Sequence, residues 1–244
     1  MLLQPQSSKI DSKKILDEVF TAFVTNKHAE FTIQASKSYQ AGEPGSSLRY
    51  GFTHFIWFRL SEMGHKQSMP KGSSLVNEPY KAMKRAFDSF PNDPWVRVAY
   101  TEFVKVFRES GLPDPKVLRT ERNADGVLVR YVDKDRPLHL RIVELSKKTL
   151  ELSPKNPVAR FQLARELSFD DPQNRQSVSD ILSVYPELRG TIWEFAAMYS
   201  LMHKRRVGAP GLPDNLNEMR QDILNRYGKS DFSETYRKTW DSIK

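Results

Sequence analysis

The feature that most constrains this chain is a local pattern that recurs at the start of four predicted helices. Each copy has a large side chain, an apolar residue three positions later, and then a small residue. The copies begin at Trp57, Trp95, Arg160 and Trp193, and successive copies are 38, 65 and 33 residues apart. One repeat of about 33 residues, doubled once, accounts for these spacings. Such a chain is expected to fold by stacking similar units on one another.

Prolines mark the boundaries of these units. Pro91, Pro154 and Pro186 each stand a few residues before a copy of the pattern. A proline cannot continue a helix, so it ends one helix and sets the direction of the next. The small residue of each copy lets a neighbouring helix approach closely. The sequence therefore predicts a series of paired helices.

The spacing of apolar residues predicts where these and other helices lie. Helices are expected over residues 11–25, 48–63, 79–90, 94–109, 136–153, 157–168, 175–185 and 188–206, with two more after residue 213. Asp11 and Asp214 are the expected N-caps, and Gly228 is the expected residue after a helix end. The stripe of Phe232, Tyr236 and Trp240 is expected to dock the last helix onto the body of the protein.

Three segments favour strands over helices. Residues 30–34 could form a short strand. Residues 116–122 and 127–132 are rich in β-prone residues and flank Asn123–Gly126, a good turn sequence, so they predict a β-hairpin.

The repeats resemble the tetratricopeptide repeat family, and Thr149–Asn156 is the best single match to the end of its second helix. The resemblance covers about residues 48–110 and 136–206. It implies a mainly all-α fold, a tetratricopeptide-like α-α solenoid with a β-hairpin insert near 116–132 and extra N- and C-terminal helices. The Trp95 copy is also similar to the half-tetratricopeptide (HAT) repeats of RNA-processing proteins, because Glu102 stands where their acidic residue does. An irregular helical bundle, with the tryptophans as core residues, is the alternative.

Three parts of the chain follow from this pattern. Residues 1–47 would form an N-terminal helix and an irregular segment, and residues 48–206 a helical-repeat domain with the hairpin insert at 111–135. Residues 207–244 would form a linker and two C-terminal helices.

The residue patterns of common enzymes are missing from the sequence. The chain has no cysteine, so disulfides, thiolate nucleophiles and cysteine-ligated metals are excluded. Its 5 histidines form no metal-binding pair of the His-Glu-x-x-His kind, and no phosphate-binding glycine loop or nucleophile elbow occurs. We therefore expect a protein that is not an enzyme and holds no metal or cofactor. With no apolar leader or membrane-length apolar run, it is expected to be soluble, intracellular and cytoplasmic.

The resemblance also implies a binding surface. The first helices of such repeats line a concave face, with a groove-facing residue five positions after each tryptophan or its equivalent. In this chain those residues are Glu62, Tyr100, Arg165 and Met198. They imply a protein partner that offers a peptide or helix with apolar and acidic groups. A purely structural role in the core is the alternative for Tyr100 and Met198.

The charge balance suggests a different kind of partner. With 38 Lys and Arg against 30 Asp and Glu, the net charge is +8, which favours acidic partners, nucleic acid among them. The candidate phosphate-binding residues are Arg119, Arg122 and Arg130 in the hairpin and Lys204, Arg205 and Arg206 at a helix end. The latter three also complement the helix dipole. The leading hypothesis is a non-enzymatic adaptor or scaffold that binds a protein partner through its helical-repeat surface, and the alternative is an RNA- or DNA-associated helical repeat protein.

Overall fold

Most of the chain is helical. The computed structural model describes residues 10–63, 77–107, 117–122, 128–132 and 136–243. Within these residues there are eleven α-helices, one short 3-10 helix and one pair of strands. The predicted all-α class is therefore confirmed.

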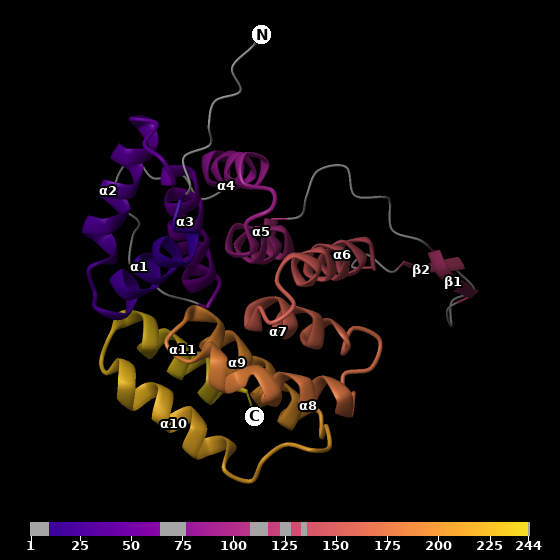
Figure 1. Cartoon of the computed structure of the whole chain (residues 1–244). Helices are drawn as coiled ribbons and strands as arrows, with labels where there is room; N and C mark the ends of the chain where they lie inside the picture. Colours follow the sequence, from indigo (N-terminus) through magenta and orange to yellow (C-terminus); the bar gives the residue numbers. More distant parts are fainter. Residues whose placement is uncertain (1–9, 64–76, 108–116, 123–127, 133–135, 244) are drawn as a thin grey trace.

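The helices follow the predicted boundaries closely. In the first half they are α1 (Ser12–Val24), α2 (His28–Gln40), α3 (Ser46–Glu62), α4 (Asn77–Ser89) and α5 (Pro94–Phe107). In the second half they are α6 (Arg136–Leu152), α7 (Pro157–Glu166), α8 (Arg175–Val184), the 3-10 helix Tyr185–Leu188, α9 (Ile192–Arg206), α10 (Leu216–Tyr227) and α11 (Asp231–Ser242). From α3 to α8, each α-helix packs against the next one in the chain. The chain turns back on itself, so that α11 packs against α1 (Figure 1).

The predicted strand at residues 30–34 is wrong, because this segment belongs to α2. The buried residues His28, Thr32 and Ala35 lie on one face of that helix at helical spacing. This face packs on α3, where the Trp57 indole Nε1 donates a hydrogen bond of 2.8 Å to the Thr32 hydroxyl. A tertiary contact therefore outweighs the β preference of Thr32 and its neighbours.

The helix ends show which predicted caps form. The Asp11 carboxylate accepts a hydrogen bond of 3.0 Å from the Lys14 backbone N–H, so the predicted N-cap of α1 is confirmed. Gly228 ends α10 with a φ of 59°, a backbone conformation that favours glycine. The N-cap of α10 is Asn215, and the prediction of Asp214 is wrong by one residue.

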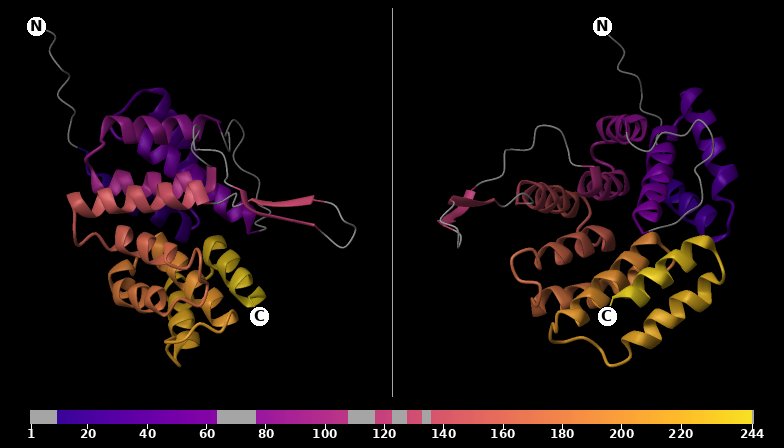
Figure 2. Two further views of the ribbon diagram at one scale, coloured as in Figure 1. Left: turned by 90° about the vertical axis from the view of Figure 1, so that its right-hand side faces the viewer. Right: turned by 180° about the vertical axis from the view of Figure 1, so that it is seen from behind.

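The strands β1 (Val117–Arg122) and β2 (Leu128–Val132) pair antiparallel, with Thr120 opposite Arg130. They form a two-stranded ribbon that projects from the helical body (Figure 2). Residues 123–127, where the sequence predicts the turn, lie outside the described residues.

An aromatic cluster joins the two ends of the chain. Phe232 and Trp240 of α11 have ring centroids 4.9 Å and 5.7 Å from that of Phe195 in α9. Phe20 of α1 lies 5.7 Å from Phe232. Phe232, Tyr236 and Trp240 are all buried, which confirms that this stripe docks the last helix. The cluster thereby fixes α11 beside α9, where it becomes one wall of a cavity.

Candidate functional site

A cavity of about 950 Å³ lies between α3, α5, α7, α9 and α11. The first four of these helices carry the repeat pattern that dominates the sequence, and α11 is the last helix of the chain. Apolar and aromatic side chains from three of the helices form part of its wall, among them Phe55, Trp193 and Tyr236. Burial raises the pKa of the Tyr236 hydroxyl to about 12, so this group stays a neutral hydrogen-bond donor at neutral pH.

The charged side chains of the cavity are mostly positive. Each of the five helices contributes one lysine or arginine, namely Arg59, Lys105, Arg165, Lys204 and Lys238. Among the described residues, Glu102 is the one carboxylate in the lining. Cations gathered on the walls of a concave site attract negatively charged ligands.

Glu102 is already neutralised by the protein. Its carboxylate accepts hydrogen bonds of 3.0 Å from both Arg165 and Gln162. Burial alone would raise the pKa of Glu102, but the positive charges of Arg165 and Lys105 outweigh burial and lower it. Glu102 is therefore ionised and paired with Arg165.

A second buried carboxylate extends this network away from the cavity. Glu166 pairs with Lys105 at 3.0 Å and lies 3.1 Å from the Nδ1 atom of His139 on α6. Burial alone would raise the pKa of Glu166, but the positive charges of Lys105 and Arg165 outweigh burial and lower it. The network thus ties α5, α6 and α7 together behind the cavity wall.

These paired carboxylates predict how acid affects stability. The pKa values of Glu102 and Glu166 are lower in the folded protein than the ordinary value of 4.5. Each glutamate therefore contributes stability that is full above that value and is lost as the pH falls through it towards the folded-state pKa. We expect the free energy of unfolding, measured with urea, to fall less between about pH 5.5 and about pH 3 in Glu166→Gln than in the native protein. Glu43→Gln, at an exposed position, is the control. If the free energy of unfolding falls equally with pH in Glu166→Gln and in the native protein, the prediction is contradicted.

Lys204 is the most deeply buried cation of the cavity, with 4% of its surface exposed. Its ammonium donates a hydrogen bond to the Ser168 hydroxyl. Ser168 in turn donates to Ser177 at 2.9 Å, and Ser177 donates to the Ala164 carbonyl at 2.6 Å. Burial lowers the pKa of Lys204, and the charge of Asp171 opposes this effect. In the described part of the chain, no carboxylate forms an ion pair with Lys204.

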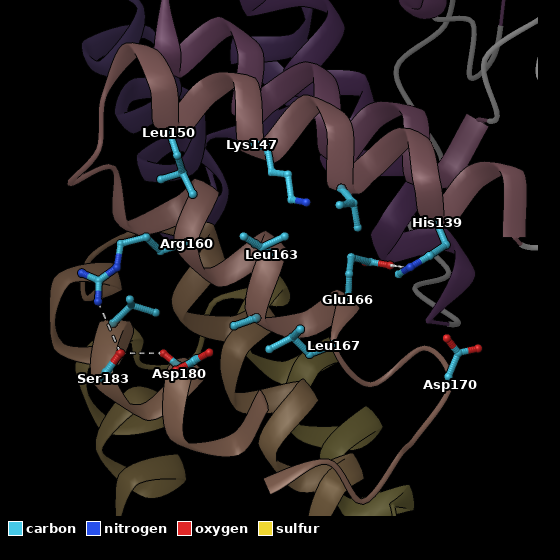
Figure 3. Close-up of a pocket in the computed structure, with 13 residues that line it drawn as sticks. His139, Lys147, Leu150, Arg160, Leu163, Glu166, Leu167, Asp170, Asp180 and Ser183 are labelled. Atoms are coloured by element: carbon cyan, nitrogen blue, oxygen red, sulfur yellow. Dashed lines mark hydrogen bonds and ion pairs between the residues drawn. The ribbon is translucent and has the colours of Figure 1, made fainter. Parts of the chain in front are cut away.

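A second cavity, of about 570 Å³, lies between α6, α7 and α8. Figure 3 shows Arg160 on one side of the cavity and Glu166 and His139 on the other, with Leu163 between them and Lys147 above Leu163. Arg160 is paired with Glu187 at 3.3 Å. Acidic and basic side chains are mixed here, since Asp170 and Asp180 also line the cavity. It therefore lacks the charge selectivity of the first cavity.

The structure places two of the four predicted partner-binding residues in the core. Tyr100 is 1% exposed and stacks on Phe87 at 4.2 Å, and Met198 is fully buried. Both predictions are wrong, because the faces of α5 and α9 that carry these residues pack against other helices. Arg165 does line the cavity, and the side chain of Glu62 lies outside the described residues.

Sequence reasoning missed most of the residues that form the site. Lys105 lies three residues after Glu102, one turn further along the same helix. On α9, Tyr199 and His203 are four residues apart, which is also about one turn of the helix. These spacings were visible in the sequence, but on α5 and α9 the offset assumed from the repeat pattern pointed to a different face of the helix. Lys238 had no such signal, because α11 lies outside the repeats.

The predicted phosphate-binding residues of α9 differ in how far they are exposed. Lys204 is buried, so its assignment to an open basic surface is wrong, whereas Arg205 and Arg206 are exposed. Arg205 donates a hydrogen bond of 3.0 Å to Asn217. For Arg119, Arg122 and Arg130 the structure describes the backbone of β1 and β2, and their side chains lie outside what is described.

Comparison with known proteins adds no assignment. Neither the family models nor the curated proteins nor the solved structures give a significant match to this chain. Among the described residues, no helix combines the length and the hydropathy needed to cross a membrane. The same residues contain no cluster of three or more histidine or carboxylate side chains that could hold a metal ion.

Proposed function

We propose that this protein is a non-enzymatic adaptor that binds an acidic segment of a partner protein in the cavity between α3, α5, α7, α9 and α11. The observation that carries the proposal is the charge of that cavity, which has five cationic side chains against one carboxylate among the described residues, with Lys105 and Arg165 already paired with Glu166 and Glu102. Because Arg165 and Gln162 already engage Glu102, the lining offers a partner mainly hydrogen-bond donors.

The arrangement of the helices supports a repeat-like architecture. We propose that α3 with α4, α5 with α6 and α7 with α8 form tetratricopeptide-like pairs, each packed through its two helices. The first helix of each pair then faces the cavity, as does α9. In repeat proteins, a concave surface of this kind serves for binding.

The apolar part of the lining favours a peptide over a simple ion. Phe55, Tyr199 and Tyr236 offer aromatic surface beside the cations, and Tyr199 is 38% exposed. Aromatic side chains contribute strongly to binding where a partner covers them. The site therefore suits a segment with both acidic and apolar side chains.

Ser168 lies beside the buried Lys204, and a serine beside a lysine can form a catalytic pair. Ser168 accepts from Lys204 and donates its own proton to Ser177, which is itself bound to a backbone carbonyl. The chain of hydrogen bonds thus ends on the backbone carbonyl of Ala164, near the end of α7. This arrangement favours a structural role for Ser168 and is consistent with a binding protein.

Site-specific photo-crosslinking tests the proposal. A benzophenone amino acid in place of Tyr199 would lie in the cavity, and the same group in place of Ile33, which is 46% exposed on α2, is the matched control. We expect a defined protein crosslinked at Tyr199 and absent at Ile33. The double substitution His203→Glu with Lys238→Glu should reduce that product about tenfold or more, because it places two negative charges on the cavity wall. The reversal Lys229→Glu, between α10 and α11, should leave it unchanged.

Two results would contradict the adaptor function. One is equal crosslinking at both positions, which would indicate nonspecific contact. The other is crosslinking of RNA or DNA at Tyr199, abolished by nuclease and weakened steeply by salt. The second result would favour the nucleic-acid alternative, and charge reversal at Arg205 and Arg206 would then be expected to weaken binding.

A further inference from the structure

We infer that binding of the acidic segment is coupled to the uptake of a proton by His139, so that binding tightens as the pH falls from about 8 to about 6. The inference rests on the proposed function and adds a regulation of the same site. It comes from the charged network that joins the larger cavity, between α3, α5, α7, α9 and α11, to the smaller cavity between α6, α7 and α8.

Helix α7 stands between the two cavities. Arg165 lines the larger cavity, and the next residue, Glu166, lines the smaller one. Lys105 of α5 also lines the larger cavity, and His139 of α6 also lines the smaller one. The Glu166 carboxylate lies 3.0 Å from Lys105 and 3.1 Å from His139. A charge that enters the larger cavity therefore acts on the smaller one through Glu166.

In the free protein, the negative charges next to His139 are already paired. Among the described residues, these charges are Glu166 on α7 and Asp170 in the loop that follows. The cations that pair with them are Arg136, Lys105 and Arg165. The other charged residues of the smaller cavity lie farther from His139 than Glu166 does (Figure 3), and they are Lys147, Arg160 and Asp180. The two carboxylates that would stabilise a proton on His139 are thus largely neutralised by their cations.

Lys105 is the member of the network that a ligand can reach. Its side chain is 37% exposed, whereas that of Glu166 is 7% exposed. An ammonium has three N–H donors, so Lys105 can donate to a ligand carboxylate in the larger cavity while it still donates to Glu166. Its single positive charge then serves two carboxylates. Glu166 keeps more of its negative charge and stabilises a proton on His139.

His139 is suited to take up this proton. Histidine is the side chain whose ordinary charge change falls between about pH 5 and pH 8. Figure 3 shows the imidazole of His139 and the carboxylate of Glu166 pointing toward one another. The proton comes from solvent and binds the ring nitrogen that lacks one, and the imidazolium then donates to Glu166. Because coupling between two sites is reciprocal, protonation of His139 strengthens ligand binding by the same factor.

Nuclear magnetic resonance of the histidine rings tests the network without a ligand. Single His→Gln variants assign the ring signals, and the pKa of His139 is then measured in charge variants of the full chain. Lys105→Met should raise the pKa of His139 by about 1, because Glu166 loses its nearest cation. Glu166→Gln should lower the pKa of His139. Arg160→Met removes a cation on the opposite side of the same cavity and is the matched control, with no change expected.

Binding of an acidic peptide tests the coupling itself. The probe is a fluorescein-labelled peptide of glutamate and leucine in equal numbers, whose glutamates stay ionised at pH 6 and above. His203 also lines the larger cavity and titrates in the same range, so the protein used is His203→Gln. Fluorescence anisotropy should give a Kd about fivefold lower at pH 6 than at pH 8. The double variant His203→Gln with His139→Gln should bind equally at both pH values.

The outcomes separate the coupling from the function that it regulates. An unchanged pKa of His139 in Lys105→Met overturns the inference, and so does peptide binding to His203→Gln that is equally tight at pH 6 and pH 8. Both results leave the adaptor function standing. If the peptide does not bind but a protein crosslinks at Tyr199, the yield of that product at the two pH values decides in the same way. Absence of both peptide binding and a crosslinked protein overturns the proposed function together with the coupling.

Discussion

Arg226→Met should lower the free energy of unfolding by about 3–5 kcal/mol, because it strips the positive partner from a fully buried carboxylate. The carboxylate is that of Glu194 in the first turn of α9, whose side chain is 0% exposed. Arg226 of α10 donates to both oxygens of this group, and one of these hydrogen bonds measures 3.1 Å. The Tyr227 hydroxyl at 3.2 Å and the Gly190 backbone N–H at 3.1 Å complete its shell, and neither carries a charge.

Thermal unfolding measured by circular dichroism checks this prediction, with an expected drop of roughly 10 °C in Tm for a chain of this size. Arg189→Met is the matched control, because Arg189 pairs with Asp222 in a contact where both side chains are half exposed. Such a pair contributes at most about 1 kcal/mol. The double variant Arg226→Met with Glu194→Gln should recover part of the loss. Equal shifts for Arg226→Met and Arg189→Met would show that Glu194 does not depend on the salt bridge.

Trp240→Ala should have a comparable effect on stability and also damage the candidate site. Trp240 is fully buried, and its ring stacks on Phe195 at 5.7 Å. Replacing a buried tryptophan by alanine costs about 3–5 kcal/mol, because the cavity that remains is only partly closed. Since Trp240 anchors α11, the variant should also loosen the wall that contains Tyr236 and Lys238.

Urea unfolding and crosslinking at Tyr199 measure the two effects separately, at a temperature where the variant is folded. Trp240→Phe is the control, because the buried indole nitrogen has no hydrogen-bond partner among the described residues and phenylalanine keeps the aromatic packing. It should retain most of the stability and the full crosslinking yield. If Trp240→Ala is destabilised but crosslinks as well as the native protein, then α11 is not part of the binding site.

The helices of this protein are largely predictable from the sequence, because the information that forms a helix is local. Asp11 caps α1 through the backbone N–H of Lys14, three residues away, and Gly228 ends α10 through its own backbone conformation. The failed strand at residues 30–34 shows the limit of local information. There, burial of His28 and Ala35 against α3 and the hydrogen bond from Trp57 to Thr32 decide the structure.

The site was less predictable, because several of its helices are apolar on more than one face. On α9, buried residues such as Phe195, Met198 and Leu201 lie on sides of the helix other than the cavity face. Periodicity alone therefore does not reveal which face lines a cavity, and the offset taken from the repeat pattern selected Met198 in the core. On α7 the same offset did select a cavity residue, because Arg165 lies on the face of that helix that lines the cavity.

The sequence by itself determined the helical class and the places where most helices begin and end, because both depend on residues close together in the chain, and its lack of cysteine excluded cysteine chemistry. Tertiary structure decided the site. The packing of α11 against α1 joins residues more than 200 positions apart and brings Lys238 to the cavity. The folded structure also buries Lys204, which the sequence shows as one of four consecutive basic residues. Burial and charge pairing depend on neighbours contributed by distant helices, and those neighbours exist only in the folded chain.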